Sequence, residues 1–271
     1  MAERIVIEGN QAHIYNGQPD PIVLPLEVFV RNVANYTLQG VEPDPRPDNS
    51  AWLARCGAAA LAIVDLKPEL RWINWIAADS PASYGPNVKT TERRLATPYV
   101  VLSIPFRDGR VMPRVQVFYR NEPLRGLDGE GGTLYWPNLL NVSPNAYGCT
   151  AWFCTQYLPV REIPLGIAAG ISEVVHHLWG GSFNRSSEEH EGKSTFSKAV
   201  EESVDPRVTD VDRWEAESAK DPRFVLSVNW KSTGITVGQL INSEMRVLQV
   251  KPAPTTAQEL VTISLRSQKG T

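Results

Sequence analysis

The sequence predicts an α+β fold in which an antiparallel sheet packs against helices. Segments rich in β-branched and aromatic residues indicate successive strands at 71–76, 99–104 and 114–119. The last two are joined by residues 107–110, where Asp108-Gly109 is a common hairpin turn. In residues 167–179 apolar side chains recur at helical spacing, and Gly180-Gly181 ends the pattern. We therefore expect a three-stranded antiparallel meander followed by a packing helix.

Further elements are predicted on both sides of this meander. Alternating apolar residues around Gly9-Asn10 indicate a hairpin over residues 4–15, and an Ala-rich stretch favours a helix at 53–64. Towards the C-terminus, segments 224–230, 245–250 and 259–265 are typical of strands. We expect these strands to pair with the N-terminal hairpin.

Three regions follow from these elements. Residues 40–50 carry three prolines in a polar setting, which predicts an irregular or polyproline boundary. We expect an N-terminal β-hairpin extension at 1–48, a core at 49–205 and a C-terminal β-rich extension at 206–271. At 271 residues, one elaborated domain or a core with appendages is the expected organisation.

Charge and hydropathy narrow the range of partners. With 27 basic and 30 acidic side chains the formal net charge is −3, so the electrostatic pattern of a nucleic-acid-binding protein is missing. No run of 18 apolar residues and no charged-then-apolar leader is present, so we expect neither a membrane span nor a signal peptide. We expect a soluble, cytoplasmic protein that binds neither nucleic acid nor membrane.

The three cysteines, Cys56, Cys149 and Cys154, do not form a disulfide pattern, and in a reducing compartment they would be free thiols. Cys56 lies in a small-residue stretch and Cys154 among aromatic residues, which favours packing roles for both. Cys149 differs because Asn141 stands eight positions before it, across a segment rich in Pro, Asn and Gly. A thiolate carrying an acyl group needs a nearby donor for the oxyanion, and such a loop can supply both groups.

This region resembles the active site of ubiquitin-conjugating enzymes, in which the catalytic Cys follows the Asn of a His-Pro-Asn triplet by eight residues. Here the triplet is Leu140-Asn141-Val142, so the His and the Pro are absent. The chain is also similar to the prokaryotic ubiquitin-conjugating-like family D of bacterial operons that encode ubiquitin-like modifiers. The shared pattern covers roughly residues 90–200 and comprises Pro98, Pro105, Phe106 and the segments 118–123, 133–135, 141–142, 148–149 and 179–184.

The resemblance implies a ubiquitin-conjugating fold, with a first helix in residues 50–66, a meander, an active-site loop and packing helices. It implies that Cys149 accepts a ubiquitin-like modifier as a thioester from an adenylating activating enzyme and passes it to an amine of a protein target. Asn141 would stabilise the oxyanion or brace the loop, while Tyr147, Gly148 and Thr150 would shape the mouth of the site. No cofactor and no metal is implied.

Two other functions remain open. The missing His and Pro permit a catalytically silent binding module, in which Asn141 caps a turn and Cys149 is buried. A Cys hydrolase that removes modifiers would need a histidine close to Cys149. The sequence places His176 and His177 on the predicted helix and His190 in the polar segment after it, without deciding whether one approaches the thiol.

Two other motifs are weaker. Glu173, His176, His177 and His190 do not share a metal-ligand spacing, which favours a solvated helix end. Residues 192–195 imitate the end of a phosphate-binding loop, but position 187 is Ser where that motif needs Gly. Neither a metal nor a nucleotide is therefore expected.

Overall fold

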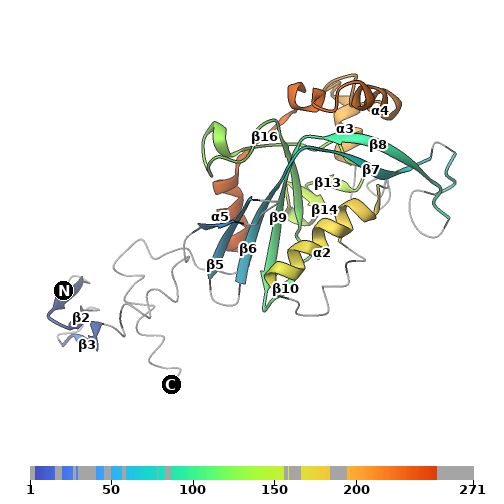
Figure 1. The fold of residues 1–271 in the computed structure, drawn as a ribbon. Helices are drawn as coiled ribbons and strands as arrows, with labels where there is room; N and C mark the ends of the chain where they lie inside the picture. Colours follow the sequence, from blue (N-terminus) through green and yellow to red (C-terminus); the bar gives the residue numbers. More distant parts are fainter. Residues whose placement is uncertain are drawn as a thin grey trace.

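The protein is α+β in the computed structural model, with mostly antiparallel sheets and helices on their faces (Figure 1). The structure describes residues 4–15, 20–26, 29, 41–45, 50–56, 59–77, 79–82, 87–155, 158, 166–183 and 194–248. None of the helices in these ranges is long and apolar enough to cross a membrane.

The central sheet has the strand order β13-β14-β11-β9-β6-β5-β4, and all of its pairs in the described residues are antiparallel. In chain order these strands are β4 (Val41–Pro45), β5 (Ser50–Cys56), β6 (Ala59–Leu66), β9 (Tyr99–Arg107), β11 (Gln116–Arg120), β13 (Val142–Pro144) and β14 (Ala151–Phe153). Short strand β10 (Arg110–Val111) pairs with β9, and β12 (Thr133–Tyr135) bridges β11 to β16 (Ser232–Thr236). The candidate Cys149 therefore lies at the end of the sheet that β13 and β14 form.

Two smaller sheets accompany the central one. In the first, β7 (Glu69–Ile76) pairs with β8 (Thr90–Thr97), and β15 (Ser182–Phe183) runs parallel to β7. The second is N-terminal and contains β1 (Arg4–Glu8), β2 (Gln11–Tyr15) and β3 (Ile22–Pro25). This N-terminal sheet has its own small hydrophobic cluster around Ile14 and Leu24, separate from the main core.

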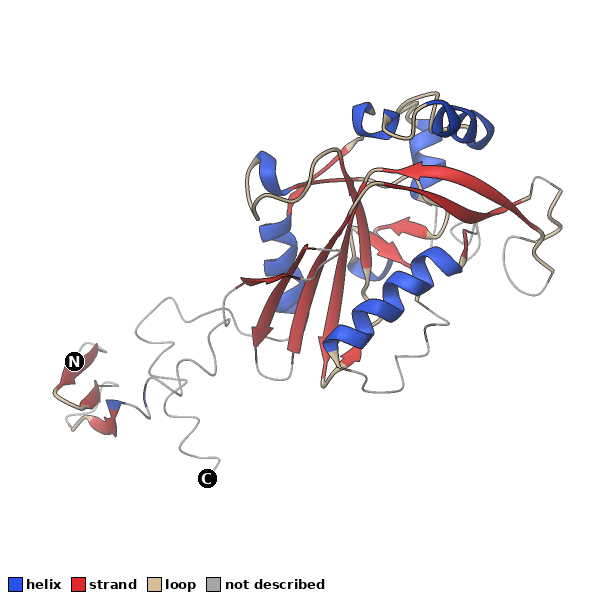
Figure 2. Ribbon diagram, viewed as in Figure 1, coloured by secondary structure: helices blue, strands red, loops and turns tan. Residues whose placement is uncertain are grey.

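The described helices are α2 (Ile167–Gly180), α3 (Thr195–Glu201), α4 (Val211–Lys220) and α5 (Val237–Val247), with the short 3-10 turns η1 (Glu130–Gly132), η2 (Ala146–Gly148) and η5 (Phe224–Ser227) (Figure 2). The N-cap side chains of Ser194, Asp210 and Thr236 each accept a hydrogen bond from the first turn of their helix. Thr236 and Gln239 cap α5 reciprocally. These caps explain why α5 begins directly after β16.

One hydrophobic core joins the central sheet, the β7–β8 pair and the helices. Strand β6 is buried at every residue, and β9 is buried from Val100 to Phe106, because neighbouring strands cover their edges while α5 packs on β6 and α2 packs on β9. The indole of Trp214 on α4 is fully buried and donates to the carbonyl of Ala96 at 2.9 Å. Helix α4 is thereby fixed against β8.

Several predicted elements are confirmed. The N-terminal hairpin of residues 4–15 is present as β1 and β2, turning at Gly9 with a φ of 58°. Asp108 and Gly109 turn β9 into β10 with φ values of 50° and 73°, the left-handed backbone that this dipeptide accepts. Helix α2 spans the predicted residues and ends at Gly181.

The predicted helix at 53–64, and with it the first helix of the ubiquitin-conjugating layout at 50–66, is wrong. These residues form β5 and β6. The Ala-rich β6 is buried at every residue, so its sequence has no alternation to distinguish a strand from a helix. The meander also differs in membership, since β6 and not segment 71–76 pairs with β9. Segment 71–76 is a strand, β7, but it belongs to the smaller sheet that also contains β8 and β15.

The C-terminal predictions are also corrected. Segment 224–230 begins with the 3-10 turn η5, and residues 245–247 end helix α5, because Leu240, Ile241, Glu244 and Met245 share one buried helical face. Segment 259–265 lies outside the described residues. The predicted irregular boundary contains β4, an edge strand that tolerates Pro43 and Pro45 because its outer side needs no ladder hydrogen bonds.

The predicted boundary at residue 205 falls between α3 and α4. Beyond it, Trp214, Val225, Leu240 and Met245 belong to the same buried cluster as the strands of the core. Strand β16 also pairs with β12. Residues 206–248 therefore complete the core and do not stand apart from it.

Candidate functional site around Cys149

Residues 145–150, called the Cys149 loop, connect β13 to β14 at the tip of a hairpin. Val142 pairs with Phe153, Ser143 with Trp152 and Pro144 with Ala151. The loop is closed by the Asn145 amide, which donates to the carbonyl of Thr150 at 3.4 Å, and by the Cys149 amide, which donates to Ala146 at 2.9 Å. The turn-forming residues of this segment thus form a tight hairpin turn between β13 and β14.

The backbone of the loop takes the left-handed conformation repeatedly. Asn145, Tyr147 and Gly148 have φ values of 63°, 52° and 68°. Asn and Gly accept this region readily, whereas a bulky residue such as Tyr147 does so only when neighbouring contacts hold it there. The contacts that hold the loop come from β11, the segment before β11, and α5.

Gln116 on β11 holds the second half of the loop. Its side-chain oxygen accepts hydrogen bonds from the amides of Thr150 at 2.7 Å and Ala151 at 3.2 Å. Its side-chain nitrogen donates to Glu244 Oε1 at 2.8 Å. One buried amide therefore links the Cys149 loop to helix α5.

Arg114 holds the first half. Its guanidinium forms a two-pronged ion pair with Glu244, at 3.0 Å from Nε to Oε2 and 2.8 Å from Nη2 to Oε1. The same guanidinium donates to the carbonyls of Tyr147 and Gly148. Because Glu244 is buried, the pair is shielded from solvent and fixes the loop more firmly than a surface ion pair.

The Cys149 thiol is enclosed by this arrangement. The residue is 2% exposed and packs with Ala146 and Trp152, with Cys154 at the margin of the cluster. Burial raises the pKa of the Cys149 thiol to about 12, against a smaller opposing effect of the Arg114 charge and with a further increase from Glu244. In this conformation the thiol is protonated at neutral pH and closed to large electrophiles.

Asn141 and Cys149 are not brought together, although the sequence spacing predicts that they meet. The Asn141 carbonyl accepts from the Cys154 amide at 3.2 Å, so Asn141 lies at the base of the hairpin while Cys149 lies in the loop at its tip. At the rise of a β-strand, the stretch from Asn141 to Asn145 spans roughly 13 Å. An oxyanion donor must lie about 3 Å from the reacting oxygen. The side chain of Asn141, which is 5% exposed, therefore does not serve the thiol here.

The three residues predicted to shape the mouth of the site do lie beside Cys149. Tyr147 is 69% exposed and its ring lies 4.8 Å from that of Trp152. Gly148 is exposed, while Thr150 is half-buried and bound through its amide to Gln116. The indole of Trp152 donates to the carbonyl of Pro113 at 2.8 Å. Tyr147 is thus an exposed aromatic residue on a loop that is held by Arg114 and Gln116.

The histidines do not complete a catalytic pair with Cys149 in the described residues. His177 on α2 lies 3.2 Å from the backbone carbonyl of Cys154, and burial lowers the pKa of its imidazole. His190 lies outside the described residues. Within the described ranges, no three His, Cys, Asp or Glu residues are grouped so that they could hold a metal ion.

Sequence reasoning missed the residues that anchor the loop. The sequence predicts Arg114 and Gln116 only as members of a strand, and Glu244 directly precedes another segment predicted as a strand. A signal was present, because Glu244 is a carboxylate on the otherwise apolar face of an amphipathic helix, where an unpaired charge is costly. The buried position of Glu244 can be recognised only if residues 237–247 are predicted as a helix.

Comparisons of the chain with protein families, with curated proteins and with solved structures gave no match. The function of the chain is therefore inferred from the geometry of the Cys149 loop.

Proposed function

We propose that the chain is a catalytically silent binding module, related in layout to ubiquitin-conjugating proteins, in which Cys149 is a buried structural residue. The observation that supports this most directly is the enclosure of the Cys149 side chain, which is 2% exposed. A second is the position of Asn141 at the far end of the hairpin. Together they leave the loop without a thiolate and without the oxyanion donor that the sequence spacing predicts.

The layout retains part of the ubiquitin-conjugating order. Antiparallel strands β6, β9 and β11 precede the Cys149 loop, and helix α2 follows it. Strands β5 and β6 replace the first helix, so the kinship to that fold stays part of the proposal.

The surface we assign to partner binding is centred on Tyr147. Exposed aromatic side chains on rigid supports are frequent anchors of protein interfaces, because they bury a large area at a small cost in conformational entropy. Tyr147 meets this description, since Arg114 holds its carbonyl and the Trp152 ring supports its own ring. The partner is a ubiquitin-like modifier protein or its activating enzyme, as the resemblance of the loop implies.

Thiol accessibility tests the silent module directly. The native protein is treated with iodoacetamide at neutral pH, and the peptide that contains Cys149 is followed by mass spectrometry. Because the thiolate fraction falls tenfold per pKa unit, we expect alkylation of Cys149 to be on the order of a thousandfold slower than in urea. Alkylation of native Cys149 at the rate of the unfolded chain would contradict a buried structural role.

Binding is tested without ATP, so that no thioester can form. A purified ubiquitin-like modifier protein is titrated with wild type, Tyr147→Ala and Cys149→Ser. We expect Tyr147→Ala to weaken binding about tenfold or more, as loss of an anchor residue does, and Cys149→Ser to bind like wild type. Equal affinity of Tyr147→Ala and wild type would reject this surface.

A thioester carrier is the second candidate, favoured by the Arg114 guanidinium, whose charge opposes the increase in the pKa of the Cys149 thiol. Opening of the Cys149 loop would then be needed to expose the sulfur. In the carrier reaction, the Cys149 thiolate attacks the thioester that joins the C-terminus of the modifier to a cysteine of the activating enzyme. The thiolate of the activating enzyme leaves, and an amine of the target later displaces the Cys149 thiol.

The two candidates differ in one assay. With modifier, activating enzyme and ATP, a carrier forms an adduct that thiols cleave, whereas Cys149→Ser forms an adduct that thiols spare and hydroxide cleaves. The silent module forms neither adduct. A wild-type thioester would therefore replace our first proposal with the second.

A further inference from the structure

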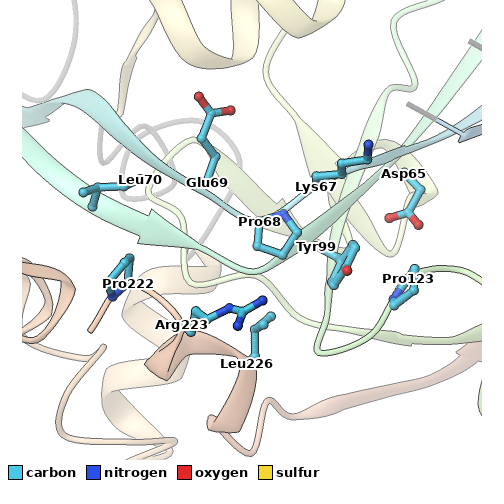
Figure 3. A pocket seen from close by; sticks show the side chains of 10 residues that line it. All are labelled: Asp65, Lys67, Pro68, Glu69, Leu70, Tyr99, Pro123, Pro222, Arg223 and Leu226. Carbon is cyan, nitrogen blue, oxygen red and sulfur yellow. The ribbon is translucent and has the colours of Figure 1, made fainter. Parts of the chain in front are cut away.

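A cavity of about 580 Å³ lies beside the turn from β6 into β7 (Figure 3). This volume is within the usual range of small-molecule sites. The walls come from the β6–β7 turn, the start of β9, the segment after β11 and the segment leading into η5. The lining residues are Asp65, Lys67, Pro68, Glu69, Leu70, Tyr99, Pro123, Pro222, Arg223 and Leu226, and none of them belongs to the Cys149 loop.

Apolar side chains form most of the wall. Proline rings, Leu70 and Leu226 line the space together with the half-buried ring of Tyr99. Figure 3 shows Tyr99 and Pro123 on one side of the cavity and Leu226 on the side of η5. A bound molecule with an aromatic ring would therefore lie against an apolar surface over most of its area.

The two acidic residues of the lining offer no open acceptor. Asp65 is 3% exposed, its Oδ1 is buried, and its Oδ2 accepts a hydrogen bond from the amide of Leu124 at 2.7 Å. The charge of the nearby Arg120 opposes that of Asp65. Glu69 is exposed but pairs with Arg71. The negative charges at the cavity are therefore already matched by cations.

The two basic residues of the lining are not matched in this way. Lys67 and Arg223 are exposed, and neither side chain forms an ion pair or a hydrogen bond with another residue that the structure describes. Asp221 accepts from the backbone amide of Arg223 at 2.9 Å and is not part of the lining. Figure 3 shows Lys67 at the β6–β7 turn and the Arg223 guanidinium on the other side, directed towards Pro68 and Leu226. The open charges at the cavity are therefore positive.

We propose that this cavity binds a small aromatic anion, with its ring between Tyr99 and Leu226 and its carboxylate or phosphate group on Arg223 and Lys67. A guanidinium group donates two parallel hydrogen bonds to such a group, and a lysine side chain adds a point charge on a long, flexible stem. The ring covers the apolar wall. This site is separate from the Cys149 loop, so it stands or falls independently of the proposed function.

The test uses three probes that share a naphthalene ring and differ in charge: 2-naphthoate, 2-naphthyl phosphate and the neutral 2-naphthalenemethanol. Each is titrated into the full chain by calorimetry, with the backbone amide of Arg223 followed by NMR. Because the alcohol lacks charge-assisted hydrogen bonds, we expect both anions to bind about tenfold more tightly or better, and added salt to weaken the anions alone. Equal affinities of the alcohol and the anions, or no binding of either anion at millimolar concentrations, would overturn the proposal.

Variants of the lining locate the binding. Arg223→Gln removes the guanidinium, so we expect the affinity for both anions to fall about tenfold while that for the alcohol is unchanged, and Lys67→Gln added to it should weaken the anions further. Arg213→Gln, an equal change of charge at an exposed position of α4 outside the lining, should bind all three probes like wild type. Leu226→Trp fills the cavity from a half-buried position and is expected to abolish binding of all three. Thermal melts of each variant confirm folding, and unchanged anion affinity in the folded protein that carries both Arg223→Gln and Lys67→Gln would reject the site.

Discussion

Burial sets the ionisation of both Cys149 and Asp65, in each case by disfavouring the charged form. The pKa of the Cys149 thiol rises to about 12 and that of the Asp65 carboxyl group to about 6. Neither group has a charged hydrogen-bond partner that fully offsets this effect, although Arg114 and Arg120 lower the two pKa values in part. Sequence alone identified Cys149 from its spacing but gave Asp65 no role, because burial is a property of the folded chain.

Asp65 makes stability depend on pH. The pKa of its carboxyl group rises from 3.8 to about 6 on folding, so the folded protein holds a proton that the unfolded chain has lost between these values. The free energy of unfolding contributed by Asp65 therefore falls as pH rises from about 4 to 6, by roughly 2–3 kcal/mol. In urea denaturation at a series of pH values, we expect the unfolding free energy of wild type, relative to Asp65→Asn, to fall by this amount as pH rises from about 4 to 6. A difference that stays constant from pH 4 to 7 would contradict the raised pKa.

At the scale of the elements, the Cys149 loop depends on a contact between β11, the segment before it, and α5. Turn-forming residues decide that a hairpin forms, but Arg114, Gln116 and Glu244 decide its exact shape. Glu244 lies 130 residues beyond Arg114 in the sequence, so no local pattern could have predicted their contact.

Arg114→Met tests this anchor. The substitution leaves the carboxylate of Glu244 buried and without its cation, so we expect a loss of about 3 kcal/mol in unfolding free energy. Iodoacetamide should also reach Cys149 faster, because the carbonyls of Tyr147 and Gly148 lose their donor. Urea denaturation and peptide mapping measure the two effects.

Two further proteins serve as controls for this anchor. Glu244→Gln added to Arg114→Met removes the orphaned charge and should restore part of the stability. Lys220→Ala breaks an exposed ion pair with Glu217 and should change stability by less than about 1 kcal/mol. An Arg114→Met protein as stable as Lys220→Ala, with Cys149 still protected, would show that the loop holds its shape without the anchor.

Helix α2 is fixed against the sheet by close contact at Gly170. A Cβ atom there would lie 2.6 Å from Cε1 of Phe106 and 3.1 Å from Cγ2 of Val111. We expect Gly170→Ala to destabilise the protein by about 1–3 kcal/mol, although alanine favours helices, because overpacking outweighs the gain in propensity. Thermal or urea unfolding measures the effect.

Ala169, the exposed neighbour of Gly170, is the control position for the effect of helix propensity alone. Ala169→Gly changes helix propensity without altering that contact and should cost about 1 kcal/mol. Stabilisation by Gly170→Ala would mean that α2 does not lie this close to β9 and β10.

At the scale of the whole molecule, residues 206–248 are part of the core. They supply β16, α4 and α5, and the buried Trp214 fixes α4 to β8. The composition of the C-terminal segments is typical of strands, so the sequence predicts an extension. An amphipathic α5 cannot be recognised once its end is assigned to a strand.

We therefore expect a fragment of residues 49–205 not to fold into a stable domain. Its loss of α5 and Trp214 exposes the faces that they cover in the full chain, and incomplete burial leaves too little hydrophobic free energy to offset chain entropy. Near-ultraviolet circular dichroism and amide NMR dispersion compare the fragment with residues 1–271. A dispersed spectrum and a cooperative transition in the fragment would show that the core is independent after all.

Local signals were sufficient to predict the hairpin turns at Gly9 and Asp108-Gly109, the strand from Tyr99, and helix α2 with its glycine end. Turn chemistry and side-chain periodicity act within a few residues, so they survive without tertiary context. Tertiary packing fixed the rest: residues 50–56 and 59–66 form two strands, Asn141 and Cys149 lie at opposite ends of a hairpin, and Asp65 is buried. Each of these depends on which distant segments share the same buried space, and that is fixed by packing of the whole chain.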